Sequence, residues 1–98
     1  MAYLPSLECD WLIKATNGNT LLLTITSLEL EESEDCSADW LTIHDGRTSS
    51  GKLLDKVCGT VASKKIRSTG QYLHLEFRSN GNVQWKGFSI QYIQGRFY

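Results

Sequence analysis

Carboxylates crowd around one cysteine in the stretch EESEDCSADWLTIHDG, residues 31–46. Seven of the chain's eleven acidic residues fall in or beside this stretch: Glu29, Glu31, Glu32, Glu34, Asp35, Asp39 and Asp45. Like charges this close in the sequence repel one another, so solvent, a bound cation or a basic partner must compensate them. The residue types alone leave these three explanations open, including a solvated acidic loop without a ligand.

The other reactive side chains do not form a recognisable catalytic set. His44 and His74 fall on the polar side of alternating segments, and spacing alone identifies no carboxylate that would orient either ring. No serine lies in a nucleophile-elbow motif, and no glycine-rich phosphate loop is present. An enzyme is therefore the least favoured class for this chain.

Charge and hydropathy exclude further classes. The formal net charge of −1 gives no sequence-wide reason to expect binding to nucleic acid or to an anionic membrane. No apolar run approaches the length needed to insert across a bilayer. Residues 1–8 lack the basic start and apolar middle of a secretory signal. We expect either a cytosolic start or a piece of a longer exported chain.

Alternating apolar residues predict β-strands along most of the chain. In YLHLEFR, residues 72–78, Leu73, Leu75 and Phe77 face one side and polar residues face the other. Similar alternation occurs in residues 11–15, 21–26, 40–44 and 88–92, and turns rich in asparagine and glycine separate these segments. The 98 residues, 41% of them hydrophobic, therefore predict one all-β antiparallel β-sandwich. Trp11 and Trp40 are assigned to its core.

Three cysteines, Cys9, Cys36 and Cys58, lack the close pairing typical of zinc sites. Cys36 and Cys58 flank a strand and its hairpin, at a spacing that suits one disulfide. Such a bridge would stabilise the fold by about 3 kcal/mol in the chain-entropy description. The alternative is a pair of buried free thiols in an intracellular protein. Cys9 is left unpaired, and an odd cysteine in an exported domain suggests a missing partner.

The order of these residues resembles a CUB domain, of the superfamily that includes the spermadhesins. The resemblance covers residues 9–93 and rests on a cysteine two residues before a tryptophan, an acidic Leu-Glu pair, a second cysteine, an Asp-Trp pair, an Asp-Gly pair, a Cys-Gly pair and a late Gly-Phe strand. These are Cys9, Trp11, Leu30, Glu31, Cys36, Asp39, Trp40, Asp45, Gly46, Cys58, Gly59, Phe77, Gly87 and Phe88. The resemblance implies a jelly-roll-like sandwich in a secreted, extracellular setting.

The chain also departs from the family pattern at its start. CUB domains usually open with about two more strands and a first cysteine, which bridges to the position of Cys9. Only eight residues precede Cys9 here. We expect one shortened CUB-like domain over residues 1–98, with a lead at 1–8, a core at 9–93 and a tail at 94–98. Cys9 would then be free to form a homodimer or a mixed disulfide.

The resemblance suggests a role for the acidic stretch. Many CUB domains bind Ca²⁺ through a glutamate, an aspartate eight residues later and a late-loop aspartate, and these positions are Glu31, Asp39 and Asn80 here. Gly81 and Asn82 stand where the family loop adds further oxygens. This donor set suits a hard cation with six to eight oxygen ligands. Asn80 removes one negative charge, so the resemblance implies weaker affinity than in relatives with aspartate.

Two further surfaces are candidates for ligands. Trp85 and Lys86 follow the expected calcium loop, where an exposed tryptophan would anchor a partner together with Glu31 and Asp39. The alternative is that Trp85 packs against the end of the sandwich. Lys64, Lys65 and Arg67 form a small basic cluster that could bind a glycosaminoglycan, although a solvated loop is the favoured interpretation.

These features predict a non-catalytic extracellular interaction module. Its calcium-stabilised loops would bind a basic side chain of a protein ligand or of a neighbouring domain in a mosaic chain. The alternatives are a spermadhesin-like carbohydrate or glycosaminoglycan binder and a structural spacer.

Overall fold

The computed structural model describes residues 8–30, 36, 39–79 and 87–95. Eight β-strands lie within these residues: β1 (Glu8–Lys14), β2 (Thr20–Glu29), β3 (Trp40–Asp45), β4 (Lys52–Val57), β5 (Thr60–Val61), β6 (Lys64–Arg67), β7 (Tyr72–Arg78) and β8 (Gly87–Gly95). No helix in this part of the chain is long and apolar enough to span a membrane. The predicted all-β antiparallel sandwich is confirmed.

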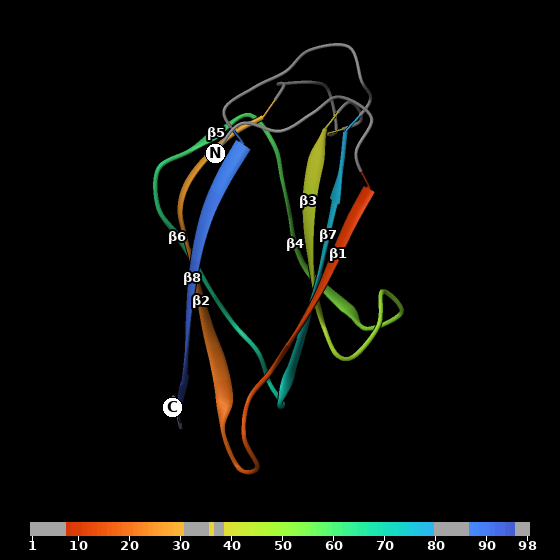
Figure 1. The fold of residues 1–98 in the computed structure, drawn as a ribbon, viewed down its shortest axis with the longest axis vertical. Helices are drawn as coiled ribbons and strands as arrows, with labels where there is room; N and C mark the ends of the chain where they lie inside the picture. The colour runs from red at the N-terminus through yellow and green to blue at the C-terminus, as the bar shows by residue number, and fades with distance from the viewer. Residues whose placement is uncertain (1–7, 31–35, 37–38, 80–86, 96–98) are drawn as a thin grey trace.

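The strands form two facing sheets (Figure 1). The first sheet has the order β1-β7-β3-β4, and all of its pairings are antiparallel. In the second sheet β2 is central: β8 pairs along one side of it, and β6 and β5 pair with successive parts of its other side. Strands β1 and β8 are therefore edge strands, and neither has a second partner among the described residues.

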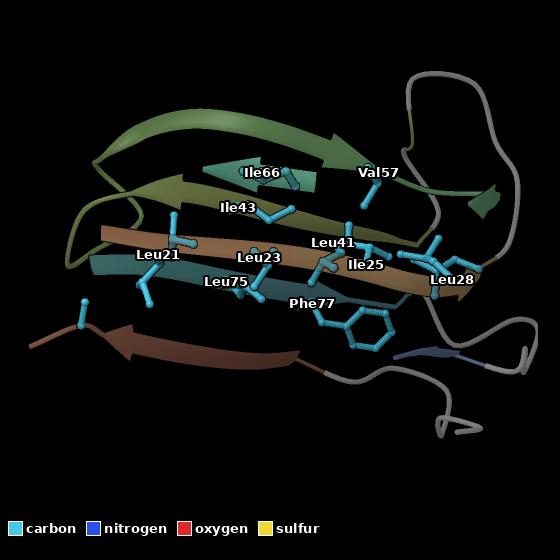
Figure 2. Close-up of a cluster of buried hydrophobic side chains, with 13 residues drawn as sticks. Leu21, Leu23, Ile25, Leu28, Leu41, Ile43, Val57, Ile66, Leu75 and Phe77 are labelled. Carbon is cyan, nitrogen blue, oxygen red and sulfur yellow. The ribbon is translucent and has the colours of Figure 1, made fainter. Parts of the chain in front are cut away.

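Side chains from both sheets fill the space between the layers (Figure 2). Burial alternates along β2 and β7, as the period-two pattern predicts. The core consists of Ala15, Leu21, Leu23, Ile25, Leu28, Leu30, Leu41, Ile43, Val57, Ile66, Leu73, Leu75 and Phe77. Because each strand turns one side inward, the same alternation places polar side chains of β3 and β7 on the outer surface.

Strands β4 and β6 lie where the sequence alternates weakly. Both strands are defined by pairing with a neighbouring strand whose sequence alternates more clearly. Leu41 of β3 lies opposite Val57 of β4, and Leu23 of β2 lies opposite Ile66 of β6. The pairing of β3 with β4 shifts register between Ile43 and His44, so that Leu54 is an extra, bulged residue on β4. Tertiary pairing, rather than local pattern, therefore decides these two strands.

Candidate calcium-binding end of the sandwich

Several strand ends meet at one end of the sandwich (Figure 1). Glu8, which opens β1, and Trp40, which opens β3, both lie opposite Arg78 at the end of β7. In the other sheet, Glu29 at the end of β2 lies opposite Gly87 at the start of β8. The segments that follow β2 and β7 and that precede β3 and β8 therefore all connect at this end.

A hydrogen bond and a disulfide fix the chain at this end. The backbone N–H of Leu30, just after β2, donates to the carbonyl of Gly59 at 2.8 Å and so continues the pairing of β2 with β5. Cys36 and Cys58 form a disulfide, with Cα atoms 5.5 Å apart. The predicted bridge is confirmed, and the alternative of two free thiols is wrong. Because Cys36 lies inside the acidic stretch, the bridge ties that stretch to the end of β4.

Asp39 is the one predicted calcium ligand within the described residues. Its side chain is fully buried, directly before β3, and the residue has a bonding or electrostatic partner. Glu31, Asn80, Gly81 and Asn82 lie outside the described residues. Their chain neighbours, Leu30 and Ser79, follow β2 and β7 at this end.

The donor set fits a hard cation. A fully buried carboxylate needs partners, because burial of an isolated charge costs several kcal/mol, and Asp39 has at least one within the protein. Carboxylate, amide and carbonyl oxygens are the ligands that Ca²⁺ takes. Within the residues described, no group of three or more His, Cys, Asp or Glu side chains is arranged to hold a metal ion. The calcium site thus stays a prediction, as do the partner contacts of Trp85 and Lys86, which also lie outside the described residues.

Cys9 is a free, partly buried cysteine on the edge strand β1. It lies opposite Phe77 and packs against the core. The expectation that Cys9 stays out of the Cys36–Cys58 bridge is confirmed, whereas the predicted homodimer stays a prediction.

The basic cluster lies on strand β6, so its assignment to a loop is wrong, whereas its three basic residues are exposed to solvent as expected. Strand β6 pairs with β2, and its alternation turns Ile66 inward and Lys65 and Arg67 outward. Lys64 forms an ion pair with Asp55 of β4, and Arg67 also has a partner. Only part of the cluster's charge is therefore presented on one face.

The assignment of both tryptophans to the core is wrong. Trp11 is 41% exposed, because it lies on the edge strand β1, where it packs against Phe88 at the margin of the sandwich. The two rings pack edge to face with centroids 5.8 Å apart. Trp40 is half-buried on the outer surface, since Leu41 takes the inward position beside it. The ammonium of Lys56 lies 4.7 Å from the centre of the Trp40 ring.

Charged side chains on the outer face of β7 form a network that the sequence did not reveal. Arg78 donates to Asp10 Oδ1 at 2.8 Å and to the Cys9 carbonyl at 3.2 Å, and its second nitrogen lies 3.5 Å from Glu76 Oε2. The hydrogen bond that Arg78 donates to Asp10, helped by the charges of Asp10 and Glu76, raises the pKa of Arg78 further above its already high ordinary value. The alternation of residues 72–78 was the only sequence signal for this network.

Comparison with known proteins agrees with the geometry. The family description "CUB domain" matches residues 1–92. The chain is 38% identical over 94 residues to cubilin of Canis lupus familiaris, and 35% identical over 95 residues to tolloid-like protein 2 of Homo sapiens. These matches cover 96% and 97% of this chain but 3% and 9% of those relatives, so it spans a small part of their length.

Solved structures show the same fold. The CUB1-EGF-CUB2 domain of human MASP-1/3 superposes with a TM-score of 0.87 over 98% of this chain and 38% of that one, at 21% identity. The full extracellular region of zebrafish Gpr126/Adgrg6 superposes with a TM-score of 0.85 over 98% of this chain and 12% of that one, at 34% identity. The sequence and the sandwich together show that this chain belongs to the CUB domain family.

Proposed function

We propose that this chain is a non-catalytic, extracellular protein-interaction module whose ligand-binding end is stabilised by Ca²⁺. The observation that carries the proposal is the fully buried carboxylate of Asp39 at the end of the sandwich where β2, β3, β7 and β8 connect. The Cys36–Cys58 disulfide and the extracellular setting of the Gpr126/Adgrg6 neighbour support an exported chain.

In this proposal, Glu31, Asp39 and Asn80 hold the ion, with oxygens from Gly81 and Asn82. A lysine or arginine of a protein partner, or of a neighbouring domain, then binds the carboxylates of Glu31 and Asp39. Trp85 and Lys86 add contacts at the rim, since an exposed tryptophan supplies a large contact area. The ion would supply positive charge that offsets the acidic stretch and fixes the loops.

The test is the melting temperature in millimolar Ca²⁺ against excess chelator. A ligand that binds only the folded state at a hundredfold excess over its Kd adds about 2.7 kcal/mol to the free energy of unfolding. We expect Ca²⁺ to raise the Tm of the unmodified chain, and Glu31→Gln and Asp39→Asn to abolish the rise. Glu32→Gln is the matched control, because it removes the same charge one residue away and should keep the rise.

An unchanged Tm, or a rise that survives both substitutions, would refute the calcium site. Asp39→Asn is a mild change, but its carboxylate is buried, so the variant's fold is checked by circular dichroism in chelator. Asn80→Asp provides a gain-of-function arm, since restoring a third carboxylate should tighten Ca²⁺ binding.

A second candidate, glycosaminoglycan binding, has one specific observation in its favour. Lys65 and Arg67 point outward from β6 on the same face. Heparin binding through this face would weaken as salt rises and would be insensitive to chelator, whereas partner binding at the calcium end would be lost in chelator. A structural spacer would show neither response.

A further inference from the structure

Two imidazoles lie side by side on the outer face of the first sheet. His44 of β3 and His74 of β7 are directly opposite in the antiparallel pairing of these strands. Their ring centres are 6.1 Å apart, and the ring planes are inclined by 46°. Because both strands are central in the sheet, the pair is fixed by backbone pairing on both sides.

The hydrogen bond of His44 indicates which of its two ring nitrogens is available to bind a metal ion. His44 Nδ1 lies 3.2 Å from the carbonyl oxygen of Gly51. A carbonyl oxygen can only accept, so Nδ1 is the donor, and in the neutral imidazole the lone pair then lies on Nε2. Histidines that bind metals almost always donate their second N–H to a carbonyl or carboxylate in this way.

A carboxylate stands in the corresponding position beside His74. Glu76 Oε1 lies 3.7 Å from His74 Nδ1, and both side chains are partly buried, with an exposure of 13% for His74 and 18% for Glu76. Among the described residues, His74 Nδ1 is the buried side-chain nitrogen or oxygen without a hydrogen-bond partner. A proton on Nδ1 would face Glu76, and a shift of less than 1 Å would complete the bond. Nε2 of His74 is then also the nitrogen with a free lone pair.

The local backbone holds this arrangement rigidly. Gly51 packs so closely against β3 that a Cβ atom there would come within 2.6 Å of the Asp45 carbonyl oxygen. Only glycine therefore allows the Gly51 carbonyl to reach His44. The bulge on β4 lies next to His44, and such bulges commonly re-aim side chains beside functional sites.

We propose that His44 and His74 form a two-histidine binding site for a divalent transition-metal ion of the zinc type. Zn–N bonds of about 2.0–2.1 Å place the centres of two imidazoles on one tetrahedral ion roughly 5 Å apart, so the rings need to approach by about 1 Å. Imidazole suits Zn²⁺, Cu²⁺ and Ni²⁺, whereas Ca²⁺ prefers oxygen. Water, or a ligand from a bound partner, fills the remaining positions.

The test is a ZnCl₂ titration of the chain, in excess Ca²⁺ so that the hard-cation site does not contribute. Long-range ¹H–¹⁵N spectra report each imidazole nitrogen, and we expect saturable shifts at Nε2 of both histidines with Nδ1 still protonated. The Tm should rise by about 10–20 °C at a hundredfold excess over the Kd. His44→Gln and His74→Gln should each abolish the saturable shift at the remaining ring.

Two control variants sharpen the result. Glu76→Gln keeps both ligands but weakens the acceptor beside His74, and we expect a loss of affinity of about tenfold. Cys9→Ser removes the free thiol, which faces the other side of the sheet, and should leave the titration unchanged. Absence of saturable Nε2 shifts in the unmodified chain, or binding that persists without either histidine, would overturn the proposal. Neither outcome depends on the calcium site.

Discussion

The two faces of strand β7 differ in the kind of contact that their side chains make. The inward side chains, Leu73, Leu75 and Phe77, are at most 3% exposed and pack against the opposite sheet. The outward side chains, among them His74, Glu76 and Arg78, are only partly buried and interact with specific neighbours on β7 itself and on the adjacent strands β1 and β3. The inward face needs only apolar volume of suitable shape, whereas the outward face depends on the identity of each neighbour. Stability should therefore reside on one face and specific chemistry on the other.

The largest loss of stability is expected from a substitution on the inward face of β7. Phe77→Ala should lower the free energy of unfolding by about 3–5 kcal/mol, because it removes a buried ring and leaves a cavity beside Phe88, whose ring centre is 5.2 Å away. Urea denaturation measures the change. Glu76→Ala, one residue earlier on the outward face, is the control and should cost less than about 1 kcal/mol. Equal losses would contradict the division between the faces.

The next largest loss of stability is expected at the end of the sandwich, where the Cys36–Cys58 disulfide constrains the chain. Replacing Cys36 and Cys58 together by serine should cost about 3 kcal/mol, since the bridge closes a loop with a sequence separation of 22. Thermal unfolding of the double variant measures the loss. A change below about 1 kcal/mol would mean that strand pairing alone holds this end.

A smaller effect is expected for the ion pair on the outward face. Arg78→Ala and Asp10→Ala should each cost up to about 1 kcal/mol, because Asp10 is 53% exposed and solvent screens the pair. The double variant should cost less than the sum of the two. Additive losses would show that the pair contributes no coupling.

The pH dependence of that coupling follows from the raised pKa of Arg78. A group whose pKa is raised on folding contributes stability below its unfolded pKa and loses it only as the pH rises through the folded value. For arginine this window lies in strong alkali, so the Arg78 contribution should be constant between pH 7 and pH 9.

The smallest change in stability is expected at the contact between Lys56 and the half-buried Trp40. Lys56→Met keeps the aliphatic stem over the Trp40 ring but removes the charge, and should cost about 0.5 kcal/mol. Trp40 fluorescence during denaturation reports the change. A cost well above about 1 kcal/mol would contradict a contact between an exposed ammonium and the ring face.

The sequence by itself determined the strands with strong alternation, the inward side of β7 and the choice of Cys36 and Cys58 for the bridge. These features are local in the chain or follow a period of two, so residue order is enough to predict them. The motif order also led to the CUB family, which comparison with known proteins then showed.

Only the tertiary structure decided which segments meet across the sheets. It made β1 an edge strand and so left Trp11 exposed, it placed the basic residues on β6, and it brought His44 beside His74 although thirty positions of sequence number separate them. Burial at an edge and pairing across strands depend on contacts between residues distant in sequence, and a single chain's residue pattern does not encode those contacts locally.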